Sequence, residues 1–315
     1  MKILVTGAAG FIGSSLVDKL LSMNVEVVGV DNFNKYYSVQ RKESNVKNAL
    51  NNEKFKLIKA DVNDKDVMED IFANEEIDKV VHLAARAGVR PSIEDPLVYE
   101  KDNIHALLVL LELAKKYKVK HFIFGSSSSV YGNNKKVPFA ETDNVDHPIS
   151  QYAATKKAGE LLCYTYHHLY NLNVTCLRFF TVYGPRGRPD MAIYKFIDKI
   201  FNDQTIEVYG NGHSKRDYTY ITDIVNGILL SLKKPKGYAI YNLGNSNTVE
   251  LLYLVKLIEN CVGKKANLKF IGKQPGDVDI TYADLTLAKT ELGYDPKIKI
   301  EEGIKKTVEW YMKQS

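Results

Sequence analysis

The sequence predicts an α/β fold in which a doubly wound parallel sheet is joined to a smaller C-terminal substrate-binding domain. Short apolar runs typical of strands alternate with helix-forming segments, and a glycine turn at residues 7–13 joins the first strand to the first helix. After residue 179 the predicted elements are shorter and glycine turns are more frequent. We therefore expect residues 1–179 to form the larger domain, with residues 216–245 returning to it, and residues 180–315 to form mainly the smaller one.

The first strand and the turn after it are suited to binding a nucleotide. Residues 2–6 form a predicted buried strand, and a helix is expected from residue 14 to residue 21. Gly7 permits a tight turn, Gly10 lets the backbone approach a pyrophosphate, and Gly13 lets the helix pack on the strand. The helix N-terminus would supply amide donors for the anion. The GxxGxxG spacing differs from the GxGxxG of dehydrogenases, so the turn needs support from the residues that follow.

The second strand, expected at residues 25–30, supplies that support because it ends in Asp31. A carboxylate at this place suits hydrogen bonding to the ribose hydroxyls of adenosine and would repel a 2′-phosphate, so NAD is preferred over NADP. Residues 33–55 are polar and contain a predicted helix at residues 38–50. This connection is longer than usual, which indicates a functional cover.

The third and fourth strands continue the alternation. The third is expected at residues 55–60, and Asp61 and Val62 after it would lie beside an adenine. The fourth, at residues 80–84, ends in Leu83-Ala84-Ala85, where small side chains let a cofactor lie against the backbone. Such an alternation is typical of a Rossmann-type sheet, which binds its ligands at the carboxyl ends of its strands.

Two cations and an apolar helix follow the fourth strand. Arg86 and Arg90 lie on an expected loop at the ligand-bearing edge, where they could bind an anion or simply be solvated. The next predicted helix, residues 96–117, contains the run Leu107–Leu111, which is apolar on all faces. Such a helix must be covered on two sides. Because the sheet can cover only one, we expect a twofold homodimer through this helix and the helix at residues 151–170.

The fifth strand and the helix after it bring serines, a phenol and a lysine to the same edge. The strand is expected at residues 121–125 and is followed by four serines at residues 126–129. In the helix at residues 151–170, Tyr152 and Lys156 are four residues apart and therefore point the same way. A neighbouring ammonium, helped by a cationic cofactor ring, lowers the pKa of a phenol from about 10 toward neutrality. The phenolate could then act as a general base.

The smaller domain is predicted from the elements that follow the sixth strand, at residues 174–179. These elements are a strand at residues 206–210, a strand at residues 216–220 that leads into a helix from residue 222, a polar turn at residues 273–277 and a closing helix at residues 300–312. Residues 238–242 are expected to return to the large sheet, so the boundary between the domains is not a single cut.

The composition argues against several classes of protein. Of the 315 residues, 45% are hydrophobic and 26% are charged, as in ordered globular proteins. The net charge is +5, but the basic residues are scattered among 38 acidic ones, which argues against a nucleic-acid or membrane-binding patch and favours small anionic ligands. No apolar run is long enough to span a bilayer, and no export signal is expected because the first strand begins at residue 2.

The cysteines and histidines predict neither disulfides nor a metal. Cys163, Cys176 and Cys261 are odd in number, lie beside apolar neighbours and form no CxxC motif, as expected of reduced thiols in a cytoplasmic protein. The seven histidines form no metal-binding spacing, and His167 and His168 are adjacent, so they face different directions on a helix. We therefore expect no metal site.

The combination of motifs resembles the extended short-chain dehydrogenase/reductase family over essentially the whole chain. The residues that carry the resemblance are Gly7, Gly10, Gly13, Asp31, Asp61, Ser127, Tyr152 and Lys156. Within the family the sequence is similar to the nucleotide-sugar 4-epimerases. The runs Arg178–Ala192 and Asp31–Tyr37 are similar to the UDP-glucuronate 4-epimerase branch.

The resemblance implies a redox-neutral cycle on tightly held NAD. In that cycle Tyr152 removes the proton from the sugar 4-hydroxyl, the C4 hydride is lent to NAD, and it returns to the other face of the 4-keto sugar. Ser127 would hydrogen-bond the reacting oxygen, and Lys156 would hold the nicotinamide ribose. The predicted cofactor-binding residues are Gly7, Gly10, Phe11, Ile12, Gly13, Asp31, Asn32, Asp61, Val62, Leu83, Ala84, Ala85, Tyr152 and Lys156.

The resemblance also implies a UDP-sugar as the substrate. The predicted contacts are Arg86, Arg90, Ser128, Ser129, Thr181, Arg188, Val208, Tyr209, Arg216 and Asp277. Arg216 is similar in place to a diphosphate ligand, and Val208 and Tyr209 to residues on the uracil side. Thr181 stands where galactose-type epimerases have asparagine, which favours a uronate. Together with Ser128, Ser129 and Arg188, it could hold the uronate carboxylate so that the 4-keto intermediate does not decarboxylate.

Rival functions are weighed against an epimerase. Related dehydratases and decarboxylases need an acid just after the catalytic hydroxyl, whereas this chain has Ser128 and Ser129 there. A noncatalytic NAD-binding regulatory protein would have no need for Ser127, Tyr152 and Lys156 together. A 4-epimerase of UDP-glucose or UDP-N-acetylglucosamine stays open as an alternative to the uronate enzyme, since the shape of the pocket decides between these sugars.

Overall fold

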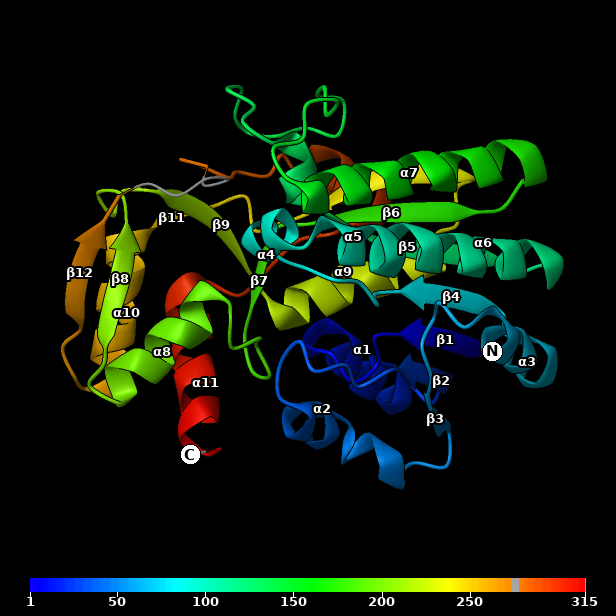
Figure 1. Ribbon diagram of the computed structural model, residues 1–315, viewed down its shortest axis with the longest axis horizontal. Helices are drawn as coiled ribbons and strands as arrows, with labels where there is room; N and C mark the ends of the chain where they lie inside the picture. Colours follow the sequence, from blue (N-terminus) through cyan, green and yellow to red (C-terminus); the bar gives the residue numbers. More distant parts are fainter. Residues whose placement is uncertain (273–277, 315) are drawn as a thin grey trace.

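The larger part of the chain is a seven-stranded parallel sheet, which confirms the predicted fold class. In the computed structural model, which describes residues 1–272 and 278–314, the strand order is β10-β6-β5-β4-β1-β2-β3 (Figure 1). The strands are β1 (Lys2–Thr6), β2 (Glu26–Asp31), β3 (Phe55–Lys59), β4 (Lys79–His82), β5 (His121–Ser127), β6 (Val174–Phe179) and β10 (Tyr238–Leu243). The order reverses after β1, so the loops that follow β1 and β4 meet at the switch point.

Helices cover both faces of this sheet. On one face lie α3 (Lys65–Glu75), α6 (Ala106–Lys116) and α7 (Gln151–Tyr170), which pack against strand residues such as Leu4 and Val80. On the other face lie α1 (Phe11–Ser22) and α9 (Ile221–Lys233), which pack against Ile3 and Val81. Because successive side chains of a strand point to opposite faces, an unbroken apolar strand supplies both cores.

The apolar run of α6 is covered within one copy of the chain, which differs from the expectation. Leu107, Leu110 and Leu111 are fully buried, because α6 lies between α3 and α7 as well as on the sheet. Only Leu108 in this run is partly exposed. The run therefore gives no argument of its own for a second subunit.

Three predicted segments differ in detail. The predicted helix at residues 38–50 is the shorter α2 (Val39–Val46), followed by the 3₁₀ turn η1 (Ala49–Asn51). The predicted helix at residues 96–117 is α5 (Pro96–Glu100), the π turn η2 (Lys101–His105) and α6. Arg90 lies on α4 (Val89–Glu94) rather than on a loop. Pro91 is compatible with this helix, because in the first turn of a helix a proline removes no internal hydrogen bond.

In the residues that the structure describes, the smaller part of the chain contains two small sheets and three α-helices, on the left in Figure 1. One sheet contains β7 (Thr181–Tyr183), β9 (Lys215–Tyr220) and β11 (Thr248–Glu250), and the other pairs β8 (Thr205–Tyr209) with β12 (Asn267–Ile271). The helices are α8 (Ala192–Phe201), α10 (Leu251–Val262) and α11 (Ile300–Met312). Between these elements, β10 pairs in parallel with β6 and extends the large sheet.

Candidate active site

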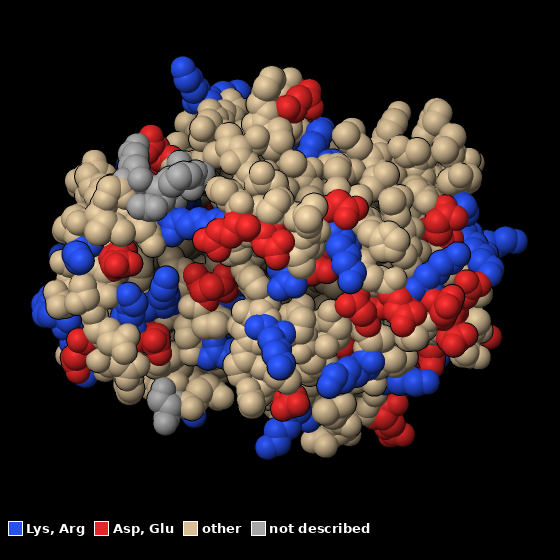
Figure 2. Space-filling model, in the orientation of Figure 1, with Lys and Arg blue, Asp and Glu red and all other residues tan. Residues whose placement is uncertain are grey.

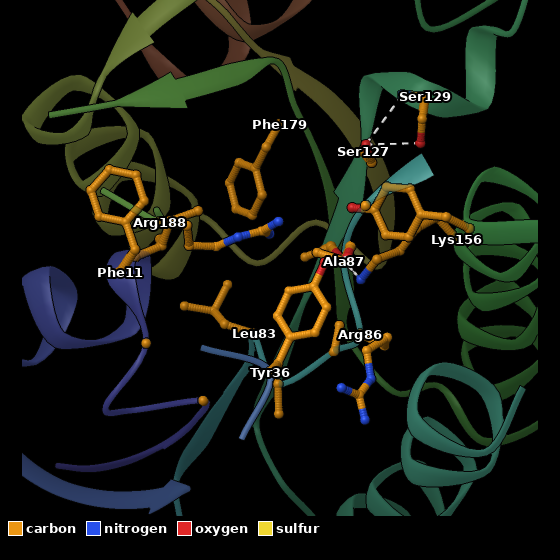
Figure 3. Close-up of a pocket in the computed structure, with 18 of the residues that line it drawn as sticks. Phe11, Tyr36, Leu83, Arg86, Ala87, Ser127, Ser129, Lys156, Phe179 and Arg188 are labelled. Carbon is orange, nitrogen blue, oxygen red and sulfur yellow. Dashed lines mark hydrogen bonds between the residues drawn. The ribbon is translucent and has the colours of Figure 1, made fainter. Parts of the chain in front are cut away.

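A cavity of about 710 Å³ lies along the carboxyl ends of the parallel strands. It is lined by the glycine turn, by the residues after β2, β3, β4 and β5, by the first turn of α7 and by the segment after β6. The predicted site residues that it brings together are Gly7, Gly10, Phe11, Ile12, Gly13, Asp31, Asn32, Asp61, Val62, Leu83, Ala84, Ala85, Arg86, Arg90, Ser127, Ser128, Ser129, Tyr152, Lys156, Thr181, Arg188 and Arg216. Figure 3 shows its central part, with Phe11 and Leu83 on one side and Ser127 and Lys156 on the other.

The glycine turn is too tight for side chains. A Cβ at Gly13 would lie 2.0 Å from the carbonyl oxygen of Gly7, and a Cβ at Gly7 would lie 2.9 Å from the amide nitrogen of Ala84. Gly7 also has a φ of +69°, which favours glycine. At Gly10 a Cβ would come 3.1 Å from the Gly7 oxygen. The helix α1 begins directly after Gly10, so its N-terminus opens onto the cavity where a pyrophosphate would be stabilised.

The carboxylate of Asp31 ends β2 and is held in place by the backbone. It accepts hydrogen bonds from the amides of Ala9 (3.1 Å) and Phe33 (2.8 Å). The ammonium of Lys42, on α2, lies 3.7 Å from the same carboxylate and is nearly buried. Burial lowers the pKa of Lys42, although Asp31 opposes the effect. Lys42 also lines the cavity, so a positive charge stands beside the predicted ribose ligand.

Asp61 lies after β3, next to the end of β2. Its carboxylate accepts hydrogen bonds from Asn32 Nδ2 (3.0 Å) and from the amide of Asn63 (2.9 Å). Burial alone would raise the pKa of Asp61, but these hydrogen bonds lower it below its usual value. Asp61 is therefore a fixed anion at the end of the cavity that is nearest to Asp31.

Ser127, Tyr152 and Lys156 meet at the other end of the cavity. Ser127 is the last residue of β5, and Tyr152 lies in the first turn of α7, which begins because Ser150 caps the amide of Ala153 (3.1 Å). The hydroxyl of Ser127 is near enough to the phenol of Tyr152 to lower the pKa of that phenol. The ammonium of Lys156 donates to the carbonyl of Gly125 (2.7 Å) and lies 6.0 Å from the centre of the Tyr152 ring.

The electrostatics of this trio differ from the expectation in one respect. Burial raises the pKa of Tyr152 above 10, and the opposing effects of Ser127 and of the Arg188 guanidinium offset only part of the rise. Lys156 is not among the groups that shift Tyr152, because its ammonium is directed to Gly125 instead of the phenol. Burial lowers the pKa of Lys156 to about 8. In the chain without its cofactor, therefore, Lys156 does not lower the pKa of Tyr152.

Ser129 orients the hydroxyl of Ser127. Its own hydroxyl donates to Ser127 Oγ (2.9 Å), and its amide does so at 3.2 Å (Figure 3). With both of these donors on the oxygen, the remaining proton of Ser127 is available to a third partner, such as the Tyr152 phenol or a reacting oxygen.

The four arginines of the cavity lie beside acids, carbonyls or aromatic rings. Arg188 donates to Asp190 (3.0 Å) and Arg86 to Asp102 (3.1 Å), while the Arg90 guanidinium lies 3.9 Å from the centre of the Tyr209 ring. Arg216 donates to the carbonyl of Lys215 (3.0 Å). Burial alone would lower the pKa of Arg188, but the pairing with Asp190 outweighs burial and raises it.

A second cavity, of about 500 Å³, adjoins the first and shares Arg90 and Arg216 with it. Tyr209 lines this second cavity. Val208 does not line either cavity, because it faces the core with an exposed fraction of 0% and its side chain cannot reach a ligand there. Adjacent residues of a strand face opposite sides, which is the reason for the difference. Asp277 lies outside the described residues.

The described residues were predicted to hold no metal and to cross no membrane. Among residues 1–272 and 278–314, no group of three or more His, Cys, Asp or Glu residues could hold a metal ion. Within the same ranges, none of the helices is sufficiently long and apolar to cross a membrane. Cys163 and Cys176 are buried free thiols and Cys261 is a partly buried one. On the face in Figure 2, basic and acidic side chains are interspersed over the surface.

Comparison with known proteins agrees with this geometry. The sequence model of the family described as GDP-mannose 4,6 dehydratase matches residues 4–307. The chain belongs to this family. It is 46% identical to a UDP-glucuronate 4-epimerase of Thermodesulfobacterium geofontis over 308 residues, which cover 98% of this chain and 95% of that relative. The resemblance to nucleotide-sugar 4-epimerases is thereby confirmed.

Solved structures of the family superpose on the whole chain. A UDP-glucuronic acid 4-epimerase from Bacillus cereus, in complex with UDP-glucuronic acid and NAD, has a TM-score of 0.94 at 36% identity and full coverage of both chains. A UDP-glucose 4-epimerase from Thermotoga maritima, solved with UDP-glucose, has a TM-score of 0.92 at 36% identity, covering 100% of this chain and 99% of the other. The same fold in this family therefore accommodates both a uronate and a neutral hexose.

The family takes its description from a dehydratase, but this member has no acid beside the serine at the end of β5. Ser128 and Ser129 follow Ser127, and both line the cavity. The cavity does contain Asp31, Asp61, Asp102 and Asp190. Of these, Asp190 pairs with Arg188 and Asp102 with Arg86. None of the four is a neighbour of Ser127 in the sequence.

Several cavity residues were missed from the sequence. These are Tyr36, Tyr37, Lys42, Asp190 and Lys195. Tyr36 and Tyr37 lie in the long polar connection that indicated a cover, so that signal pointed to the correct segment but to no particular side chain. Lys42, Asp190 and Lys195 obey no spacing rule, since they reach the site only through the tertiary fold.

Proposed function

We propose that this protein is a UDP-sugar 4-epimerase that works with resident NAD and takes UDP-glucuronate as its substrate. The observation that carries the proposal is the placement of Ser127 beside Tyr152, with Lys156 near both, at the end of a dinucleotide-sized cavity that has no acid next to the serine. Such a set transfers a proton to and from a hydroxyl but has no second acid or base for elimination.

The residues present fit NAD. The glycine turn leaves no room for a Cβ, and the N-terminus of α1 opens onto the cavity, so the turn and Phe11 and Ile12 would hold the pyrophosphate. Asp31 and Asn32 would bind the adenosine ribose, and Asp61 and Val62 the adenine. When bound, NAD supplies a hydride acceptor at the sugar C4 and returns the hydride within the same turnover.

The chain's own residues would move one proton in each direction. Tyr152 would remove the proton from the sugar 4-hydroxyl and later return it, and Ser127 would hold the same oxygen by a hydrogen bond. Because burial raises the pKa of Tyr152, the phenolate needs a nearby positive charge. The Arg188 guanidinium supplies one such charge, since it lowers the pKa of Tyr152, and an oxidised nicotinamide ring would supply another. Lys156 would hold the nicotinamide ribose.

The sugar-binding residues would lie between the catalytic trio and the second cavity. Thr181, Ser128 and Ser129 would offer hydroxyls, and Arg188 a guanidinium, to the uronate carboxylate. Arg216, which lines both cavities, would contact the diphosphate, and Tyr209 the uridine. Arg86 and Arg90 are further candidates for the anionic groups.

A neutral hexose is the second candidate substrate, and one observation favours it. Arg188 already pairs with Asp190, so a uronate carboxylate would have to compete with Asp190 for the guanidinium. A neutral sugar would leave that pair intact. The balance favours the uronate because Thr181 and the serines add donors whose best contacts are with two carboxylate oxygens in one orientation.

We also propose a twofold homodimer in the cytoplasm. Leu161 and Leu169 of α7 have exposed fractions of 55% and 58%, and Tyr164 on the same helix is about half exposed. Together with the partly exposed face of α6, they would form a self-complementary patch. Sedimentation velocity should give a dimer that Leu161→Asp with Leu169→Asp dissociates, and cell fractionation tests the location.

Product analysis tests the proposed function directly. The purified protein is incubated separately with UDP-glucuronate and UDP-glucose, and the C4 epimers are resolved by chromatography or NMR. We expect UDP-galacturonate from the first, no net NADH, and NAD released only after denaturation. Steady accumulation of NADH would instead indicate a dehydrogenase, and epimerisation of UDP-glucose alone would indicate the neutral hexose.

A further inference from the structure

Tyr36 joins the two loops that flank the glycine turn. In the sheet, β1 lies between β2 and β4, so the loops after β2 and β4 stand on either side of the turn after β1. The hydroxyl of Tyr36, from the loop after β2, donates to the carbonyl of Ala87 (2.7 Å), in the loop after β4. Both residues line the main cavity. Figure 3 shows the Tyr36 ring standing in this cavity with its hydroxyl directed at Ala87.

The loop that carries Ala87 is held in place by several hydrogen bonds. The side chain of Asn103 accepts a hydrogen bond from the backbone amide of Arg86 (2.7 Å) and donates one to the backbone carbonyl of Arg86 (3.0 Å). The Arg86 side chain pairs with Asp102 (3.1 Å), and the phenol of Tyr99 donates to the same Ala87 carbonyl (2.9 Å). The carbonyl oxygen, which has two lone pairs, is thereby presented in one direction and accepts both phenols.

The loop and the ring of Tyr36 are also held in a fixed position. The side-chain oxygen of Asn34 accepts a hydrogen bond from the backbone amide of Tyr36 (3.2 Å). The ammonium of Lys42 donates to the same oxygen (3.0 Å). The Tyr36 ring lies 5.2 Å from the Arg86 guanidinium and 5.6 Å from that of Arg188. Two cations beside one ring favour a fixed ring position by cation–π attraction. Burial raises the pKa of Tyr36, so the phenol keeps its proton and remains a donor.

Gly88 makes room for the approach of this phenol. A Cβ at Gly88 would lie 2.9 Å from the Tyr36 oxygen, and the φ of +112° also requires glycine. Gly88 on one loop and Tyr36 on the other are therefore both needed for the hydrogen bond between Tyr36 and Ala87.

We propose that the Tyr36–Ala87 hydrogen bond is a clasp that closes over the dinucleotide and retains it through many turnovers. The inference rests on the proposed function, because an epimerase that lends a hydride and takes it back needs a cofactor that does not exchange between the two steps. A dinucleotide seated on the glycine turn, with its adenosine near Asp31 and its nicotinamide near Lys156, would have to pass the clasp to leave or to enter.

The clasp has a kinetic signature that a simple ligand contact lacks. A barrier on the path slows entry and exit alike, so weakening it accelerates both rates and leaves Kd unchanged. Loss of a direct contact between Tyr36 and the dinucleotide would accelerate exit only, and Kd would rise by the same factor. The two roles are therefore separated by measuring the dissociation rate together with Kd.

The test uses the purified holoprotein and isotopically labelled NAD. Exchange of bound for labelled NAD gives the dissociation rate, and equilibrium dialysis gives Kd. We expect Tyr36→Phe to accelerate exchange by about 2- to 12-fold, the factor that corresponds to about 0.5–1.5 kcal/mol for one hydrogen bond, with Kd unchanged. Gly88→Ala should accelerate exchange in the same way by displacing the phenol.

Tyr99→Phe is the matched control, since it removes a phenol from the same carbonyl without breaking the link between the loops, and its exchange rate should equal that of the wild type. Exchange in Tyr36→Phe at the wild-type rate, or a rise in Kd that matches the faster exchange, would overturn the clasp. Wild-type protein that loses its NAD during gel filtration would overturn it too. In that case, formation of UDP-galacturonate with added NAD would still support the proposed function.

Discussion

A buried ion pair beneath the active site is expected to hold α7 against the sheet. Arg178, on β6, donates to both carboxylate oxygens of Glu160, on α7, at 2.8 Å each, and both side chains are 1% exposed. Ser126, next to Ser127, donates to the same carboxylate (2.7 Å). Arg178 also donates to the phenol of Tyr131 (2.9 Å). Together with Ser126, the pair therefore connects the helix that carries Tyr152 and Lys156 with the strand end that carries Ser127.

Arg178→Met removes the cation and leaves Glu160 buried with Ser126 as its remaining side-chain donor. Breaking a buried pair by removing one partner costs about 3–5 kcal/mol, and we expect the free energy of unfolding to fall by that amount. The double variant Arg178→Met with Glu160→Met should regain much of the lost free energy of unfolding. Two apolar side chains of similar volume leave no buried charge that needs a partner. Lys306→Met is the control, since its exposed pair with Glu302 is worth only about 0.3–0.5 kcal/mol.

Urea denaturation followed by circular dichroism measures all four proteins. A loss below about 1 kcal/mol in Arg178→Met would refute the reasoning, because that is the range of a single ordinary hydrogen bond. A double variant less stable than Arg178→Met would equally refute it, since the cost would then come from lost packing and not from the stranded charge of Glu160.

Four further outcomes are expected. Tyr152→Phe should fold normally but lose about 10²- to 10⁴-fold in kcat, the usual worth of a positioned base, and unaltered turnover would remove Tyr152 from that role. Activity should fall as the pH rises through about 8, where the Lys156 ammonium loses its proton, and Lys156→Met should lack this limb of the pH profile. Thr181→Ala or Arg188→Ala should weaken uronate binding and raise the fraction of decarboxylated 4-keto pentose, measured by mass spectrometry. If both variants keep the wild-type ratio of epimer to decarboxylated product, the carboxylate contacts lie elsewhere. Asp31→Ala should weaken the discrimination against NADP in binding assays, and a wild-type preference for NADP would contradict the reading of Asp31.

Much of the fold could be predicted because its local signals agree. The helix α7 was predicted at its observed bounds, since Ser150 caps its start and Asn171 ends it in a left-handed conformation. The π turn between α5 and α6 could not be predicted, because the run Leu107–Leu111 that follows it is apolar on all faces and so does not show the change of phase that an extra residue causes. The helix that carries Arg90, α4, was expected as a loop; it has only six residues, which is too short for a helical period to show in the sequence.

The candidate site could be predicted where topology alone brings residues together. All parallel strands end at one edge, so Asp31, Ser127 and the first turn of α7 had to share it. The partner of Tyr36 and the position of Lys42 depend on how the long connection folds back, and no sequence rule encodes that path. Val208 is a different case, since strand alternation already assigns it and Tyr209 to opposite faces.

The fate of the C4 hydrogen shows whether the hydride that leaves the sugar is the one that returns to it. The holoprotein is incubated with UDP-glucuronate that carries deuterium at C4, in ordinary water and with excess unlabelled NADH in solution. The account predicts UDP-galacturonate that retains the deuterium at C4, because the hydride is lent to a resident cofactor and returned to the same sugar. Product with hydrogen at C4, taken from the solvent or from the added NADH, would contradict the account.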